Sequence, residues 1–157
     1  MSLIVEDGTG LEDSNSYVSV SESEDILLDL GYDQFPSETD LIKATLYIDT
    51  NFRPVSNILN EDQALLWPRE KFTDSQDRKI TGIPFELKRT TSIVAASFID
   101  NDLFDEEPSI TQESYGDTSV TYSGPVSQTD GNVKAAMVRL KKLGYGSSSS
   151  TIRLTRA

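Results

Sequence analysis

Residues 84–101 constrain the fold of this 157-residue chain most strongly, because their hydrophobic pattern predicts its strongest helix, with one wide apolar face. The residues that recur at helical spacing on its main face are Leu87, Thr91, Val94 and Phe98. Neighbouring isoleucines and alanines widen that face, and Pro84 stands in the first turn, where a missing N–H is tolerated. A wide apolar face must pack against other elements. We therefore expect this helix to lie at the centre of a helical core.

Start and stop signals predict further helices around this one. Ser19 and Glu22 fit a capping box, with Gly31 as a stop signal. A second start at residues 36–40 leads into a helix that ends before Pro54. The expected helices span about residues 19–30, 36–53, 60–66 and 132–143.

The remaining segments predict loops, one hairpin and a tail. Residues 69–83 have no hydrophobic period and several helix breakers, which indicates a long interhelical loop. Two β-prone runs around Gly116-Asp117 predict a β-hairpin at about residues 110–122. We expect a mainly α protein: a small helical bundle at 1–145 with that hairpin and the long loop, followed at 146–157 by a flexible linker and an extended C-terminal tail.

The composition argues against several classes of enzyme. The chain has neither cysteine nor histidine, which removes thiolate ligands, the commonest general base and the usual partner of a nucleophilic serine. A phosphate or calcium loop at residues 7–10, a cation site among the acids of residues 100–107, and a carboxylate pair are alternatives without the spacing that would select them. We expect a binding protein that is not an enzyme and has no cofactor and no metal.

Charge is distributed unevenly along the chain. The formal charge is −12 at pH 7, so the chain as a whole is expected to repel nucleic acid. Residues 1–62 contain only Lys43 and Arg53 as basic residues, whereas residues 131–157 contain no acid. The cations of that basic end are Lys134, Arg139, Lys141, Lys142, Arg153 and Arg156. A bipolar chain can dock its basic end on an acidic surface, including the acidic face of a second copy.

The hydrophobic runs are much shorter than the ~20 residues that a membrane span needs. The N-terminus also lacks the basic and apolar regions of a secretory signal. We therefore expect no membrane attachment, and a location in a cytosol-like compartment or in a particle assembled there.

Two features remain open to more than one interpretation. Trp67 is expected in the core, together with Leu87, Val94 and Phe98, and its alternative role is stacking on a base. The tail at 151–157 alternates apolar and basic residues, which suits either a frayed terminus or a tethered peptide that anchors to a partner.

Several stretches, taken in order, resemble tailed-phage head–tail connector proteins, also called adaptor or head-completion proteins, of the family often labelled DnaT-like single-stranded-DNA-binding protein. They cover residues 3 to about 122. The stretches are LIVEDGTG at 3–10, SNSYVS at 14–19, ALLWPR at 64–69, IP at 83–84, LKRT at 87–90 and VTY at 120–122.

This resemblance implies a ring of about twelve copies below the portal, in which each copy meets its neighbour heterologously. Implied partners are the portal protein, neighbouring copies, a tail or second connector protein, and genomic DNA that passes through the channel without specific binding. The implied location is the virion neck, after synthesis in the host bacterial cytoplasm. The loop residues that would reach the next subunit are Arg69, Lys71, Phe72, Arg78 and Lys79. The tail residues that would bind the portal are Ile152, Arg153, Leu154 and Arg156.

The alternative function is that of a single-stranded-DNA-binding replication accessory protein. Such a protein needs a basic groove with aromatic platforms. The basic C-terminal helix and tail contain one aromatic residue, Tyr145.

Overall fold

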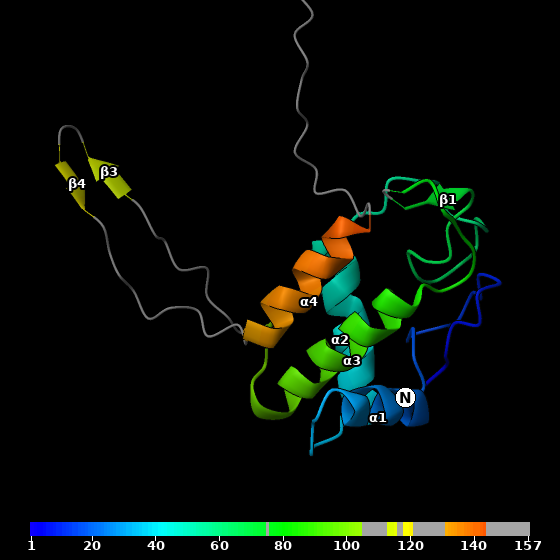
Figure 1. Cartoon of the computed structure of the whole chain (residues 1–157), viewed down its shortest axis with the longest axis horizontal. Coiled ribbons are helices and arrows are strands. Elements are labelled where there is room, and N and C mark those ends of the chain that lie inside the picture. Colours follow the sequence, from blue (N-terminus) through cyan, green and yellow to red (C-terminus); the bar gives the residue numbers. More distant parts are fainter. Residues whose placement is uncertain (75, 105–112, 116–117, 121–130, 144–157) are drawn as a thin grey trace, which may run out of the picture.

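The computed structural model describes residues 1–74, 76–104, 113–115, 118–120 and 131–143 (Figure 1). Within these ranges the chain forms four helices and two small antiparallel hairpins, which confirms the expected mainly α class. The elements are α1 (Val20–Asp29), α2 (Glu38–Asn51), β1 (Phe72–Thr73), β2 (Lys79–Ile80), α3 (Phe85–Asp100), β3 (Glu113–Tyr115), β4 (Thr118–Val120) and α4 (Gly131–Lys142).

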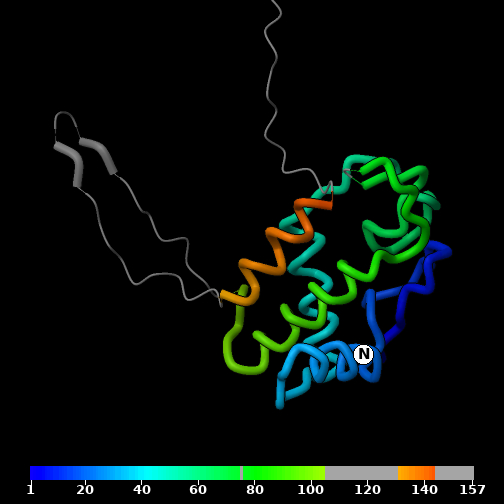
Figure 2. Tube along the Cα trace, in the orientation of Figure 1, coloured from blue at the N-terminus to red at the C-terminus, as the bar shows by residue number. Residues whose placement is uncertain are grey.

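Helix α3 is the centre of the bundle, as its pattern predicts. Helices α1, α2 and α4 each pack against it (Figures 1 and 2). Every residue from 90 to 98 is buried, so the helix has no solvent-facing side over that length. Its buried hydroxyls are satisfied locally: Thr90, Thr91 and Ser92 each donate to the carbonyl four residues earlier at 2.8–2.9 Å.

The first two helices begin where their capping signals predict. Ser19 Oγ accepts a hydrogen bond from the backbone N–H of Glu22 at 3.2 Å, and the Glu22 carboxylate accepts from the Ser19 backbone. Ser37 and Asp40 form the same reciprocal pair at the start of α2. Each pair satisfies backbone donors that the first helical turn leaves free.

A buried carboxylate organises the N-terminal segment. Glu6 is 2% exposed. Its Oε1 accepts from the backbone N–H groups of Gly8 and Gly10 at 3.0 and 2.9 Å, and its Oε2 accepts from Leu11 N–H and Ser14 Oγ, both at 2.9 Å. The acidic, glycine-rich stretch is therefore a turn folded around its own carboxylate. This segment lies beside residues 52–83 (Figure 2), and the two are joined by the bond from Ala64 N–H to the Leu11 carbonyl at 2.9 Å.

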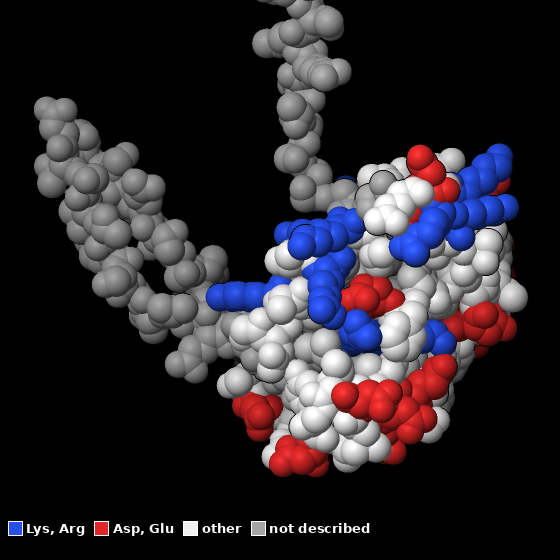
Figure 3. All heavy atoms as spheres, viewed as in Figure 1, with Lys and Arg blue, Asp and Glu red and all other residues white. Residues whose placement is uncertain are grey.

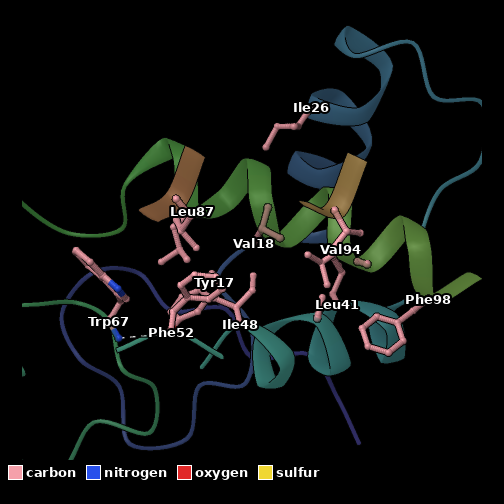
Figure 4. Packing of buried hydrophobic residues seen from close by; sticks show 14 of the residues in the cluster. Tyr17, Val18, Ile26, Leu41, Ile48, Phe52, Trp67, Leu87, Val94 and Phe98 are labelled. Atoms are coloured by element: carbon pink, nitrogen blue, oxygen red, sulfur yellow. Dashed lines mark hydrogen bonds between the residues drawn. The ribbon is translucent and has the colours of Figure 1, made fainter. Parts of the chain in front are cut away.

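Trp67 lies in the core where the N-terminal segment, α2 and the loop before α3 meet. It is 2% exposed and is followed by a cis peptide bond to Pro68. Figure 4 shows it with Tyr17 at one end of the core, below Leu87 of α3. The backbone N–H of Trp67 donates to the Tyr17 hydroxyl at 3.3 Å, and that hydroxyl donates to Asp49 Oδ1 at 2.6 Å. The other residues expected in the core, Leu87, Val94 and Phe98, are also buried.

The prediction of a short helix at residues 60–66 is wrong. Its local signal is present, because Asn60 N–H donates to the Gln63 side chain at 3.0 Å. Other hydrogen bonds replace those of a helix. The Ala64 N–H donates to the distant Leu11 carbonyl, and Gln63 Nε2 donates to the carbonyls of Leu65 and Pro68. The backbone donor of Ala64 is thus bonded outside the segment, and the segment forms turns.

The expectation of an irregular loop at 69–83 is corrected in part. Strands β1 and β2 pair within it, Phe72 opposite Ile80 and Thr73 opposite Lys79. The turn between them is held by Asp74, whose carboxylate accepts from the backbone N–H groups of Gln76 and Arg78 at 2.9 Å. The sequence has no strand-length apolar run here because each strand is only two residues long.

The hairpin expected at about 110–122 is confirmed in its described part. Strands β3 and β4 are antiparallel, with Glu113 opposite Val120 and Tyr115 opposite Thr118. The tail and its proposed anchor residues Ile152, Arg153, Leu154 and Arg156 lie outside the described residues. Within the described part, no helix is long and apolar enough to cross a membrane.

Candidate functional site

Basic side chains from three elements line one side of the bundle. Figure 3 shows Lys and Arg gathered over the half of this face that carries α4 and the β1–β2 hairpin, while Asp and Glu lie mainly over the half that carries α1. The charge asymmetry of the sequence is therefore also an asymmetry of the folded surface. Three adjoining hollows, which all include Glu86, lie on the basic side and have volumes of about 320, 230 and 330 Å³.

We name this surface the basic cleft. It runs from the β1–β2 hairpin, past the start of α3, to α4 and the end of α1. Its charged or aromatic lining residues are Asp74, Arg78, Lys79, Phe85, Glu86, Arg89, Arg139 and Lys142, with Tyr32 at the α1 end.

The hairpin end of the cleft is held by a buried acid. Arg78 Nε donates to Asp74 Oδ2 at 2.7 Å, and the Asp74 side chain is 3% exposed. The backbone N–H of Arg78 and that of Gln76 hold the pKa of Asp74 below its ordinary value, with the Arg78 guanidinium adding to the effect. Asp74 thus neutralises Arg78 and leaves Lys79 as a cation of the hairpin that forms no ion pair with a described acid.

The start of α3 contributes an exposed aromatic ring and an ion pair. Phe85 is 58% exposed, and the Arg89 guanidinium lies over its ring at 5.2 Å from the centroid. Arg89 also contacts Glu86 Oε2 at 3.5 Å. Residues four apart lie on the same helical face, so Phe85 and Arg89 form a single cation–π unit at the cleft wall.

Helix α4 supplies the cations opposite α3. Val133, Ala136 and Leu140 are buried against the bundle, which turns Arg139 and Lys142 into the cleft. Among the described residues, Lys79, Arg139 and Lys142 form no ion pair within 4.0 Å. The cleft therefore has three cations that no described acid neutralises.

Two of the five residues expected to reach a neighbouring subunit have structural roles instead. Phe72 is 1% exposed and packs edge-on against Trp67, with ring centroids 4.8 Å apart. Arg69 is half-buried, and its guanidinium donates to the backbone carbonyls of Leu66, Pro54 and Ser56. These two predictions are corrected, because the core and the loop carbonyls occupy the side chains.

The other three remain on the surface. Lys71, Arg78 and Lys79 are exposed, and the structure brings the last two together with the α4 cations. Sequence reasoning missed Phe85 as a site residue. The signal for it was the Phe85–Arg89 spacing at the start of the helix.

The fold and this surface define a small helical protein with a cationic cleft on an acidic body. A model of the family described as "Putative DnaT-like ssDNA binding protein" matches residues 1–157, and the chain belongs to this family. No curated protein and no solved structure gives a significant match.

Among the described residues, no group of three or more acidic side chains is placed to hold a metal ion.

Proposed function

We propose that the protein binds single-stranded DNA in the basic cleft. The observation that carries this proposal is the meeting of Lys79, Arg139 and Lys142 with the exposed Phe85 ring in one cleft. A basic groove with an aromatic platform is the arrangement that single-strand binding requires. The description of the family points to the same ligand.

The chemistry of each side chain determines which part of the DNA it would contact. Lys79, Arg139 and Lys142 would contact backbone phosphates, because each lacks a described acidic partner. Phe85 would stack on one base, since an unstacked base offers its π-face to any aromatic ring. The Arg89 guanidinium over that ring would then fix the platform from its other side. Duplex DNA keeps its bases stacked inside, so this platform favours single strands.

Affinity per copy is expected to be modest. The cleft offers three uncompensated cations, while the whole chain carries a formal charge of −12. Non-specific binding by phosphate contacts gives dissociation constants of about 10⁻⁴–10⁻⁶ M at physiological salt. We place this protein at the weak end of that range.

Replacing Phe85 by alanine tests the platform. Stacking contributes about 1–3 kcal/mol per base, so Phe85→Ala should weaken binding of a labelled oligo-dT at least fivefold. Phe35 is 37% exposed and lies outside the cleft, so Phe35→Ala is the matched control and should leave binding unchanged. Equal affinities for the wild-type protein and Phe85→Ala would rule out the platform. Equal affinity of the wild type for duplex and single strands would rule out the strand preference.

A second candidate function is that of a tailed-phage neck adaptor, and the charge segregation of the folded surface favours it. Helix α1 carries exposed acids such as Asp25 and Asp29, and the acids in Figure 3 lie mainly over the half of the face that carries α1, whereas the other half carries most of the basic cleft. Complementary faces on one chain suit head-to-tail contacts between copies. On this candidate, copies made in the host cytoplasm form a ring of about twelve between the portal and the tail or second connector. Residues 151–157 would anchor on the portal, DNA would pass without specific binding, and the chain would have no catalytic step.

Paired charge reversal tests the second candidate. Asp25→Lys/Asp29→Lys creates a chain with two basic faces, and Arg139→Glu/Lys142→Glu creates a chain with two acidic faces. Each variant alone should fail to assemble on purified portal, and an equal mixture should recover rings, as counted by mass photometry. A wild-type protein that stays monomeric with portal, or that is missing from purified virions, would remove this candidate.

A further inference from the structure

A further hollow lies on a different face of α4 from the basic cleft. It runs between α4 and the C-terminal part of α2 and has a volume of about 400 Å³. We name it the α2–α4 groove. Its lining residues are Tyr47, Asn51, Phe52, Val133, Lys134, Met137, Val138 and Lys141. On α4 these positions recur at helical spacing and include neither Arg139 nor Lys142, so the two surfaces are separate.

The residues at the bottom of the groove are apolar, and the residues at its rim include two cations. Phe52 and Val133 are buried, and Met137 is half-buried. The two charged lining residues are Lys134 and Lys141, and no acid lines the groove. Among the described residues neither lysine forms an ion pair. The Lys141 ammonium lies 5.5 Å from the centroid of the Phe52 ring, which places positive charge directly above the apolar floor.

The spacing of the two lysines sets the geometry of a ligand. They are seven residues apart on α4, or about two helical turns and roughly 10.5 Å along the axis. Between them stands Val138, which is 51% exposed. An apolar side chain with a cation on either side along the helix is complementary to a segment with the inverse pattern.

We propose that the α2–α4 groove docks an acidic, amphipathic segment of a partner protein. Its apolar side chains lie on Met137 and Val138, and two carboxylates about two turns apart pair with Lys134 and Lys141. This is the helix-in-groove mode of recognition. The proposal does not depend on the ligand of the basic cleft.

The charge and the floor together select this occupant. A basic segment would be repelled by both lysines. A nucleic-acid strand needs exposed rings for its bases, whereas the Phe52 ring is 5% exposed and lies beneath Lys141. A volume of about 400 Å³ accommodates a few side chains, so the contact is expected to be small and reversible.

Peptide selection on the full-length protein tests the proposal. A phage-displayed library of random dodecamers is panned on immobilised wild-type protein, and the recovered peptides are synthesised and their affinities measured by fluorescence anisotropy. We expect a consensus with apolar residues between acidic ones. Two exposed ion pairs each contribute a few fold, so Lys134→Gln/Lys141→Gln should weaken these peptides about tenfold.

Matched surface variants separate the groove from general stickiness. Val138→Ser changes an exposed side chain in the groove and should also weaken the peptides. Leu46→Ser changes a similarly exposed residue of α2, 59% exposed and outside the lining, and should not. Recovered peptides that are basic, or that bind both groove variants as tightly as the wild type, would overturn the proposal. A concentration-dependent dimer that Val138→Ser abolishes would also overturn it, because the occupant would then be a second copy.

Discussion

Replacing Glu6 by glutamine should destabilise the protein strongly without changing its size. The carboxylate is 2% exposed and accepts four hydrogen bonds, two on each oxygen. In Glu6→Gln one oxygen becomes an NH₂ group. That group would face two donors, the Leu11 N–H and the Ser14 hydroxyl. The hydroxyl can rotate to accept, but the backbone N–H cannot.

The cost follows from the bonds that are lost. Hydrogen bonds to a charged group contribute about 1.5–3 kcal/mol each. In Glu6→Gln the bond from the Leu11 N–H is lost, which leaves that donor facing an NH₂ group, and the other three bonds lose their charge. The lower desolvation of a neutral amide offsets part of this cost, so the expected loss is about 2–4 kcal/mol. For a domain of this size, that loss corresponds to a fall in Tm of roughly 4–16 °C.

Urea denaturation near neutral pH, followed by tryptophan fluorescence, measures this loss. Glu12→Gln is the control, because Glu12 is an exposed acid of the same segment. It should change the free energy of unfolding by less than about 0.5 kcal/mol. If Glu6→Gln cost less than about 1 kcal/mol, the buried carboxylate would not organise the N-terminal turn, and our account of residues 3–14 would be wrong.

Two further predictions concern the junction around Trp67. Burial raises the pKa of Asp49 to about 6, despite hydrogen bonds from Tyr17 and the Leu66 N–H. The folded protein therefore binds a proton on the Asp49 carboxyl more tightly than the unfolded chain does. The free energy of unfolding that this carboxyl contributes falls as pH rises from about 4 to about 6, by up to about 3 kcal/mol. The free energy of unfolding of Asp49→Asn, measured by urea titration at several pH values, should lack this component; a pH dependence parallel to that of the wild type would contradict the assignment. Trp67→Ala should cost about 3–5 kcal/mol as a core truncation, and an unchanged Tm would mean that Trp67 does not pack in the core.

The elements that the sequence predicted well are those with local signals. Ser19 with Glu22, and Ser37 with Asp40, satisfy backbone donors within one turn, so the start of each helix is encoded next to where it forms. The wide apolar face of α3 likewise indicated its central position.

The failures share a physical cause, which is competition from distant residues. Phe72 is buried because Trp67 supplies the ring it packs against, and Arg69 is occupied because three loop carbonyls converge on it. The segment at 60–66 is not helical because Ala64 bonds to Leu11. None of these partners can be identified from local spacing.

The candidate site was predictable only in part. The basic end of the chain was visible in the sequence, but the cleft joins Lys79 to Arg139 and Lys142 across about sixty residues of chain. Their meeting depends on how α4 packs on α3. The overall charge of −12 predicted repulsion of nucleic acid. It gave no indication of a cationic surface, because the fold separates the basic side chains from the acidic ones.

The central claim is that the basic cleft binds single-stranded DNA, and salt-dependent fluorescence anisotropy with a labelled oligo-dT tests it most directly. Three phosphate contacts predict a slope of about −2 for the logarithm of the affinity against the logarithm of salt concentration. Arg139→Gln/Lys142→Gln should bring that slope close to −0.7. The control Lys43→Gln should leave the slope unchanged, because Lys43 does not line the cleft and already contacts Asp102 at 3.9 Å. No binding at low salt, or a slope that the double variant does not change, would contradict the claim and leave the neck adaptor as the leading candidate.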